Sequence, residues 1–87
     1  MEGMDYVYVL RSKKDGDLYI GSTTDLRGRI AQHNNQKVFS TKHRIPFELV
    51  YCEAYKDICD ARERESKLKL RGNTRYHLMQ RISKSLH

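Results

Sequence analysis

The sequence predicts an α+β domain, in which a small three-stranded antiparallel sheet is flanked by three helices in the order β-β-α-β-α-α. Aromatic and β-branched residues alternate with a period of two in three short segments, and a glycine-containing turn joins the first two. Apolar residues recur at helical spacing in three other segments. Because the chain has 87 residues, a single domain over 1–87 is expected.

The first two strands form a predicted hairpin. Residues 5–12 are rich in tyrosine, valine and leucine, and residues 18–21 return after a polar turn. Side chains two positions apart share a face of a strand. Tyr8 therefore lies on one face of the first strand with Tyr6 and Leu10. Tyr19 shares a face of the returning strand with Gly21.

The first helix is expected to run from the capping residues 22–25 to His33 or Asn34. Gly28 inside it costs roughly 1 kcal/mol relative to alanine. Arg29 and His33 are spaced i,i+4 and stand along one edge of the apolar stripe. That stripe consists of Leu26, Ile30 and Ala31.

Residues 47–55 predict a third strand that is apolar on both faces, which is typical of a strand inside a sheet. Its two faces are Phe47, Leu49 and Tyr51 on one side and Val50, Cys52 and Ala54 on the other. The last two helices are expected from Asp57 to about Leu70, with Gly72 as the stop, and from Asn73 or Thr74 to about Leu86.

The helix expected from Asp57 to about Leu70 has a narrow apolar arc formed by Ile58, Ala61 and Leu68, and Glu65 lies inside this arc. A carboxylate at such a position needs a partner, because removing a bare charge from water costs several kcal/mol. Two alternatives are open. Glu65 pairs with Lys69 one turn later, or it holds a metal ion, since Mg²⁺ often uses one or two protein carboxylates together with water and phosphate.

The charge balance favours an anionic partner. Seventeen Lys and Arg against eleven Asp and Glu leave a net charge of +6, which suits nucleic acid or an acidic membrane surface. No apolar run approaches the ~20 residues that span a bilayer, and no signal peptide is apparent, so a cytoplasmic location and no membrane partner are expected. Cys52 and Cys59 lack zinc-ligand spacing and are expected to be reduced, buried or half-buried thiols.

Several basic and hydroxyl side chains are candidates for contacts with nucleic-acid phosphates. The alternative is that they belong to an ordinary solvated surface. The candidates in the connection after the first helix are Lys37, Thr41, Lys42 and Arg44, and those farther along are Lys69, Arg71 and Arg75.

Five residues together could form an active site that hydrolyses a phosphodiester with one metal ion: Tyr8, Tyr19, Arg29, His33 and Glu65. A tyrosine can orient or deprotonate the attacking water, a guanidinium can stabilise charge on the phosphate, and a histidine can move a proton near neutral pH. Each residue also has an ordinary structural explanation. The tyrosines can be sheet aromatics, Arg29 a solvated helix residue and His33 a histidine at a helix end.

Taken in order, these residues resemble the GIY-YIG nuclease superfamily. The matching pieces are Tyr6-Val7-Tyr8, Tyr19-Ile20-Gly21 ten residues later, Arg29 with His33, and Arg64-Glu65 with Leu68-Lys69. Three further stretches resemble the small stand-alone branch of excinuclease-C-like endonuclease-domain proteins. They are Ser40-Thr41-Lys42, Pro46-Phe47-Glu48-Leu49-Val50 and Asp60-Ala61-Arg62.

The resemblance implies a metal-dependent DNA endonuclease, structure-directed or weakly sequence-specific, with a place in DNA repair or recombination. It implies that Tyr8 acts as base or positions the water, supported by Tyr19, and that Arg29 stabilises the transition state. It further implies that His33 assists at the phosphate or the proton and that Glu65 holds one Mg²⁺ or Mn²⁺ ion. The family also carries a late asparagine, for which Asn73 is the candidate here.

Two hypotheses follow from the sequence. The first is this endonuclease, with DNA as substrate and a protein partner that could supply targeting. The second is a nucleic-acid-binding module, or a subunit of a larger nuclease complex, that cleaves little by itself.

Overall fold

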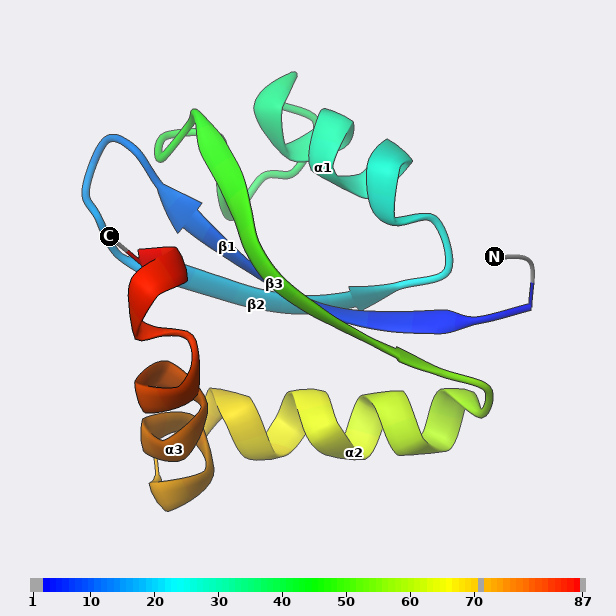
Figure 1. Ribbon diagram of the computed structural model, residues 1–87. Coiled ribbons are helices and arrows are strands. Elements are labelled where there is room, and N and C mark those ends of the chain that lie inside the picture. Colours follow the sequence, from blue (N-terminus) through cyan, green and yellow to red (C-terminus); the bar gives the residue numbers. More distant parts are fainter. Residues whose placement is uncertain (1–2, 71, 87) are drawn as a thin grey trace.

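The computed structural model describes residues 3–70 and 72–86, and it confirms the α+β class and the element order. The three strands form one antiparallel sheet with the order β2-β1-β3. Figure 1 shows α1 on one face of this sheet and α2 on the opposite face, with α3 across the C-terminal end of α2. The elements are β1 (Asp5–Ser12), β2 (Leu18–Thr23), α1 (Leu26–Asn34), β3 (Phe47–Tyr55), α2 (Ile58–Lys69), α3 (Asn73–Arg81) and the 3-10 helix η1 (Ser83–Leu86).

The central strand is β1, not the third strand that the apolar pattern indicated. Residues 7–10 of β1 are each no more than 1% exposed, since β1 pairs on both sides and is covered on both faces. β3 lies at an edge, and its Cys52 and Ala54 are exposed. A two-sided apolar pattern therefore did not distinguish the edge strand from the central one.

A bulge in β3 also corrects the predicted faces of that strand. The register opposite β1 shifts between Val9 and Leu10, so that Leu49 faces Leu10 and Tyr51 faces Val9. Phe47 consequently packs on the α1 side of the sheet and Tyr51 on the α2 side.

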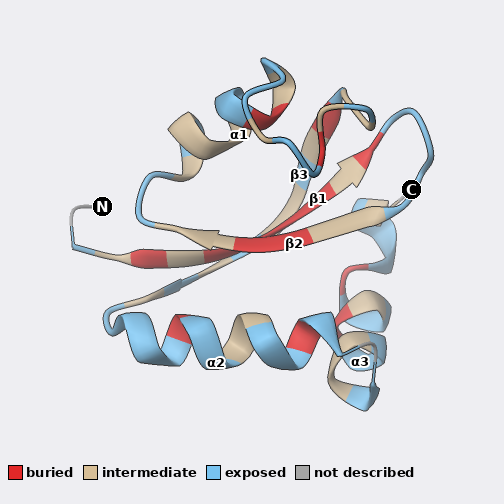
Figure 2. Cartoon of the chain, turned by 180° about the vertical axis from the view of Figure 1, so that it is seen from behind, coloured by how far each residue is buried: buried red, intermediate tan, exposed pale blue. Residues whose placement is uncertain are grey.

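Each face of the sheet has its own apolar cluster. Figure 2 shows the buried residues that β1 and α2 contribute. Alternate residues of β1 serve the two clusters, as a period of two requires. The cluster under α2 and α3 contains Val7, Val9, Ile20, Ala61, Leu68, Leu78 and Ile82. The cluster under α1 is built on Tyr8, Leu10 and Phe47, with Tyr19, Leu26, Ile30 and Ile45 packed against it.

The helix ends follow local chemistry. Asp25 caps α1 by accepting from the Gly28 N–H at 3.1 Å. A Cβ at Gly28 would lie 2.8 Å from Cγ of Asp25, so glycine leaves room for this cap. Asp57 caps α2, which begins one residue later at Ile58.

Four expectations about helix length, capping and exposure were wrong. The helix α3 ends at Arg81 and a 3-10 turn follows, and its N-cap is Gly72, which makes no side-chain cap. Cys52 and Cys59 are free but exposed, since they lie on an edge strand and on the first turn of α2. Ile58, expected in the apolar arc of α2, is 45% exposed. No helix in the described part of the chain is long and apolar enough to cross a bilayer.

Gly21 gives a test of how tightly the sheet packs around Tyr8. A Cβ added at Gly21 would lie 2.6 Å from Tyr8 Cζ and closer still to its hydroxyl, and Tyr8 is buried. We expect Gly21→Ala to lower the free energy of unfolding by about 1–3 kcal/mol, measured in urea.

The control is the same substitution in a Tyr8→Ala background, where the clash no longer exists. There the cost should fall well below its value in the wild-type background. An equal cost in both backgrounds would show that the Tyr8 ring does not limit this position.

Candidate active site

A chain of buried hydrogen bonds connects β1, α1 and the connection that follows α1. The Tyr8 hydroxyl lies 3.0 Å from Nε2 of His33, and Nδ1 of His33 lies 2.8 Å from the Thr41 hydroxyl. All three side chains are at most 1% exposed. The Thr41 hydroxyl is also 3.5 Å from the Val38 carbonyl oxygen.

These contacts favour one proton arrangement. With the Thr41 proton directed to the carbonyl of Val38, the Thr41 oxygen accepts from Nδ1–H of His33. Nε2 is then the acceptor for the Tyr8 hydroxyl. Burial and the positive charge of Arg29 lower the pKa of His33 from 6.5 to about 4, so this imidazole is neutral at pH 7.

Aromatic rings enclose His33 on the α1 side of the sheet. The ring of Tyr19 is 4.9 Å from it and that of Phe47 is 5.8 Å from it, both at steep angles. Asn34, the next residue of α1, accepts from the Phe47 N–H at 2.7 Å and donates to the Phe47 carbonyl at 3.1 Å. This pair of bonds holds the end of α1, and with it His33, against β3.

Arg29 lies one turn before His33 and close enough to act on both members of the Tyr8–His33 pair. Burial raises the pKa of Tyr8, and the Arg29 guanidinium acts in the opposite direction. Arg29 also donates to the Gln32 side chain at 2.9 Å. The structure thus brings four of the five predicted site residues together: Tyr8, Tyr19, Arg29 and His33.

Glu65 lies apart from these four, because α2 covers the opposite face of the sheet. It accepts a hydrogen bond of 2.6 Å from Ser22 of the edge strand β2 and pairs with Lys69 at 2.6 Å. Burial alone would raise the pKa of Glu65, but the bonds from Lys69 and Ser22 hold it below its ordinary value. After burial, the charge of Glu65 is one of the smaller contributions to the raised pKa of Tyr8.

The orientation of Glu65 depends on its neighbour Arg64. The Arg64 guanidinium donates twice to Glu53 of β3, at 2.9 Å each. Tyr51 and Tyr55 donate to the same carboxylate. This cluster fixes the rotation of α2 against the sheet and so turns Glu65 toward β2.

Comparison with known proteins shows the family of this chain. The model of the GIY-YIG catalytic domain matches residues 4–81. The chain belongs to the GIY-YIG family. Among similar proteins, a UPF0213 protein of Streptococcus pneumoniae serotype 4 is 40% identical over 70 residues, which cover 79% of this chain and 70% of that protein. UPF0213 protein SH2523 of Staphylococcus haemolyticus is 43% identical over 65 residues, 74% of this chain and 78% of that protein.

A solved structure shares the fold. The solution NMR structure of UPF0213 protein BH0048 from Bacillus halodurans is 32% identical, with a TM-score of 0.56 over 91% of this chain and 84% of that one. The chain is therefore a GIY-YIG nuclease domain of the small UPF0213 type.

The residues of this GIY-YIG domain suit a metal ion bound through a single carboxylate. Across residues 3–70 and 72–86, no group of three or more His, Cys, Asp or Glu side chains could hold a metal. Glu65 is ionised, its side chain is 18% exposed, and the hydroxyl of Ser22 adjoins it. One such oxygen ligand suffices for Mg²⁺ when water and phosphate complete the octahedron.

Sequence reasoning took Ser22 only as a capping candidate and missed its contact with Glu65. The signal was present, because a period of two from Ile20 places Ser22 on the face that α2 covers. Asn34 and Arg64 were also missed as positioning residues.

The predicted phosphate contacts have different surroundings. Lys37 is exposed, Lys42 is half-buried, and Lys69 is half exposed beside Glu65. Arg44 is engaged with Asp15 at 2.7 Å, and this pair holds the pKa of Asp15 well below its usual range. Arg75 is half-buried and Asn73 is exposed in the first turn of α3, whereas Arg71 lies outside the described residues.

Thr41 differs from its expected place on the surface. Its side chain is fully buried because its hydroxyl bonds to His33. It belongs to the interior of the site rather than to a phosphate-contacting surface.

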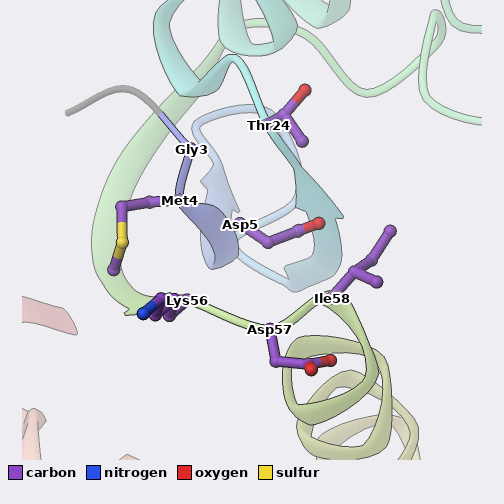
Figure 3. Close-up of a pocket in the computed structure, with 7 residues that line it drawn as sticks. All are labelled: Gly3, Met4, Asp5, Thr24, Lys56, Asp57 and Ile58. Carbon is purple, nitrogen blue, oxygen red and sulfur yellow. The ribbon is translucent and has the colours of Figure 1, made fainter.

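An open pocket of about 450 Å³ lies elsewhere, between the start of β1 and the start of α2 (Figure 3). Asp57, one of its lining residues, already caps α2 through a 2.7 Å bond from the Cys59 N–H. None of the predicted site residues lines this pocket.

The low pKa of His33 predicts a pH-dependent stability. The unfolded chain binds a proton at His33 below pH 6.5, whereas the folded chain does so only near pH 4. The contribution of neutral, buried His33 to the free energy of unfolding is therefore complete above pH 6.5 and is lost as the pH falls toward 4. We expect the free energy of unfolding in urea to fall by roughly 2 kcal/mol between pH 7 and pH 5.

Three carboxylates have lowered pKa values, and they lose their contribution to folding stability only at lower pH. They are Asp15, Glu53 and Glu65. The matched control is His33→Gln, in which the slope between pH 7 and 5 should flatten. An imidazole NMR signal of His33 that titrates near 6.5 would contradict the prediction.

Proposed function

We propose that this GIY-YIG domain is a metal-dependent DNA endonuclease that hydrolyses phosphodiester bonds. The observation that carries the proposal is the buried Tyr8–His33 pair beside Arg29, with an ionised Glu65 at the adjoining sheet edge. The net charge of +6 supports an anionic polymer as substrate.

Tyr8 and His33 would handle the proton of the attacking water. The Tyr8 hydroxyl donates to Nε2 of His33, which leaves an oxygen lone pair free to accept from water. As the water attacks, its proton passes to Tyr8 while the Tyr8 proton passes to His33. Tyr19 packs against His33 and keeps the ring in place.

Arg29 would stabilise the charge that develops on the scissile phosphate, where a guanidinium offers two parallel donors. It has a second effect within the site. Its charge helps to keep His33 neutral before the substrate binds. A phosphate next to Arg29 would offset that charge and make His33 a better proton acceptor.

Glu65 would hold one Mg²⁺ or Mn²⁺ ion, with Ser22 orienting the carboxylate. The ion would supply Lewis-acid help at the phosphate oxygens. Lys69 now occupies one oxygen of Glu65 at 2.6 Å, so a metal ion and Lys69 compete for it. A Lys69 released in this way would become available to a DNA phosphate.

A binding module without cleavage is the second candidate, and the basic surface supports it equally. The two differ in metal dependence. DNA affinity should survive EDTA in both cases. Only an endonuclease nicks the strand, and EDTA should abolish that nicking.

Glu65 and Arg29 provide the test of the site. We expect Glu65→Gln and Arg29→Ala to lower the nicking rate at least about 100-fold, with DNA affinity largely retained, because each removes charge stabilisation at the phosphate. The measurement uses labelled single strand, duplex, flap and splayed fork with Mg²⁺ or Mn²⁺.

Two matched variants serve as controls. Glu63→Gln alters an exposed carboxylate of the same helix, which pairs with Lys67 at 3.2 Å, and Arg27→Ala alters an exposed arginine of α1. Both should nick at the wild-type rate. Wild-type nicking by Glu65→Gln or Arg29→Ala would refute the site assignment.

Thr41 tests the proton arrangement. Thr41→Val keeps the shape but removes the partner of His33 Nδ1, so we expect a loss of about 1–3 kcal/mol in stability and at least about tenfold in nicking. Thr41→Ser keeps the hydroxyl and should restore both. A ¹⁵N NMR measurement of the His33 tautomer separates positioning from general destabilisation, and an unchanged tautomer in Thr41→Val would count against this role.

A further inference from the structure

Phe39 is a large aromatic side chain left in solvent. It is 83% exposed, whereas the other phenylalanine, Phe47, is 4% exposed. Phe39 belongs to the connection between α1 and β3, two residues before Thr41. Burial in the core does not explain its presence, since neither apolar cluster includes it.

The connection that carries Phe39 is fastened to the site. The Thr41 N–H donates to the Val38 carbonyl at 3.2 Å, so the chain turns tightly around Phe39. The Lys37 N–H donates to the Gln32 carbonyl at 2.9 Å, and the Thr41 hydroxyl bonds to His33. Phe39 is thus held in a defined place relative to His33.

A positive charge accompanies the ring. Nζ of Lys42 lies 4.7 Å from the ring centroid of Phe39. The exposed Lys37 precedes it by two residues. An apolar ring with ammonium groups around it matches one nucleotide, whose base can stack while its phosphate meets a cation.

We propose that Phe39 and Lys42 form a stacking site for an unpaired nucleotide next to the scissile phosphate. The inference rests on the proposed function and specifies its substrate class: DNA with a single-stranded segment beside the cleavage point, such as a flap or splayed fork. Bases inside a duplex are already stacked on both faces, so only an unpaired base can use the ring. Stacking on one aromatic side chain changes affinity by roughly 5- to 100-fold.

The test measures binding in EDTA, where no cleavage occurs, for a splayed fork and for a blunt duplex of the same length. We expect Phe39→Ala to weaken fork binding roughly 5- to 100-fold and duplex binding less than about twofold. Phe39→Trp should retain fork affinity. The matched control is Tyr76→Ala, which removes an aromatic side chain 59% exposed on α3 and should bind both DNAs as the wild type does.

Position is tested with 5-iododeoxyuridine placed at the first unpaired nucleotide of the fork. Photocrosslinking should join it to Phe39 and disappear in Phe39→Ala. Equal weakening of fork and duplex binding by Phe39→Ala would overturn the proposal. Unchanged binding would also overturn it and would indicate that Phe39 contacts a protein partner instead. A wild-type protein that binds neither DNA would instead overturn the proposed function itself.

Discussion

The site depends on one buried hydrogen-bond chain, from Tyr8 through His33 to Thr41. It joins the central strand, the first helix and the connection after it, which are segments up to 33 residues apart in the sequence. Three buried polar groups are stable there only because each satisfies the next. The same chain favours one tautomer of His33, and the proposed proton transfer uses that tautomer.

The sheet divides the site into two halves. Tyr8 and His33, which we propose handle the proton, lie on the α1 side, and Glu65 lies on the α2 side. Gly21 of β2 has no side chain to block the Tyr8 hydroxyl, and Ser22 beside it donates to Glu65. The narrow edge of β2 is therefore where a phosphate could meet both halves.

In the proposed function, charge balance at Glu65 would connect metal binding with DNA binding. Lys69 neutralises this carboxylate in the protein alone. A divalent ion would take that role and free a lysine next to the substrate path. Glu65 keeps a cationic partner throughout such an exchange, so no bare carboxylate is left at the site.

The sequence by itself determined the hairpin and the helices and predicted five candidate site residues, because side-chain period, turn chemistry and capping are local properties. It also indicated that Glu65 faces inward. Only the tertiary structure decided that β1 is central, that a bulge in β3 turns Tyr51 away from Phe47, and that Thr41 is buried against His33. It likewise placed Glu65 on a helix that covers one face of the sheet and the Tyr8 side chain in the cluster on the opposite face. These features arise from pairing between distant segments, and no local pattern encodes which strand takes the middle position.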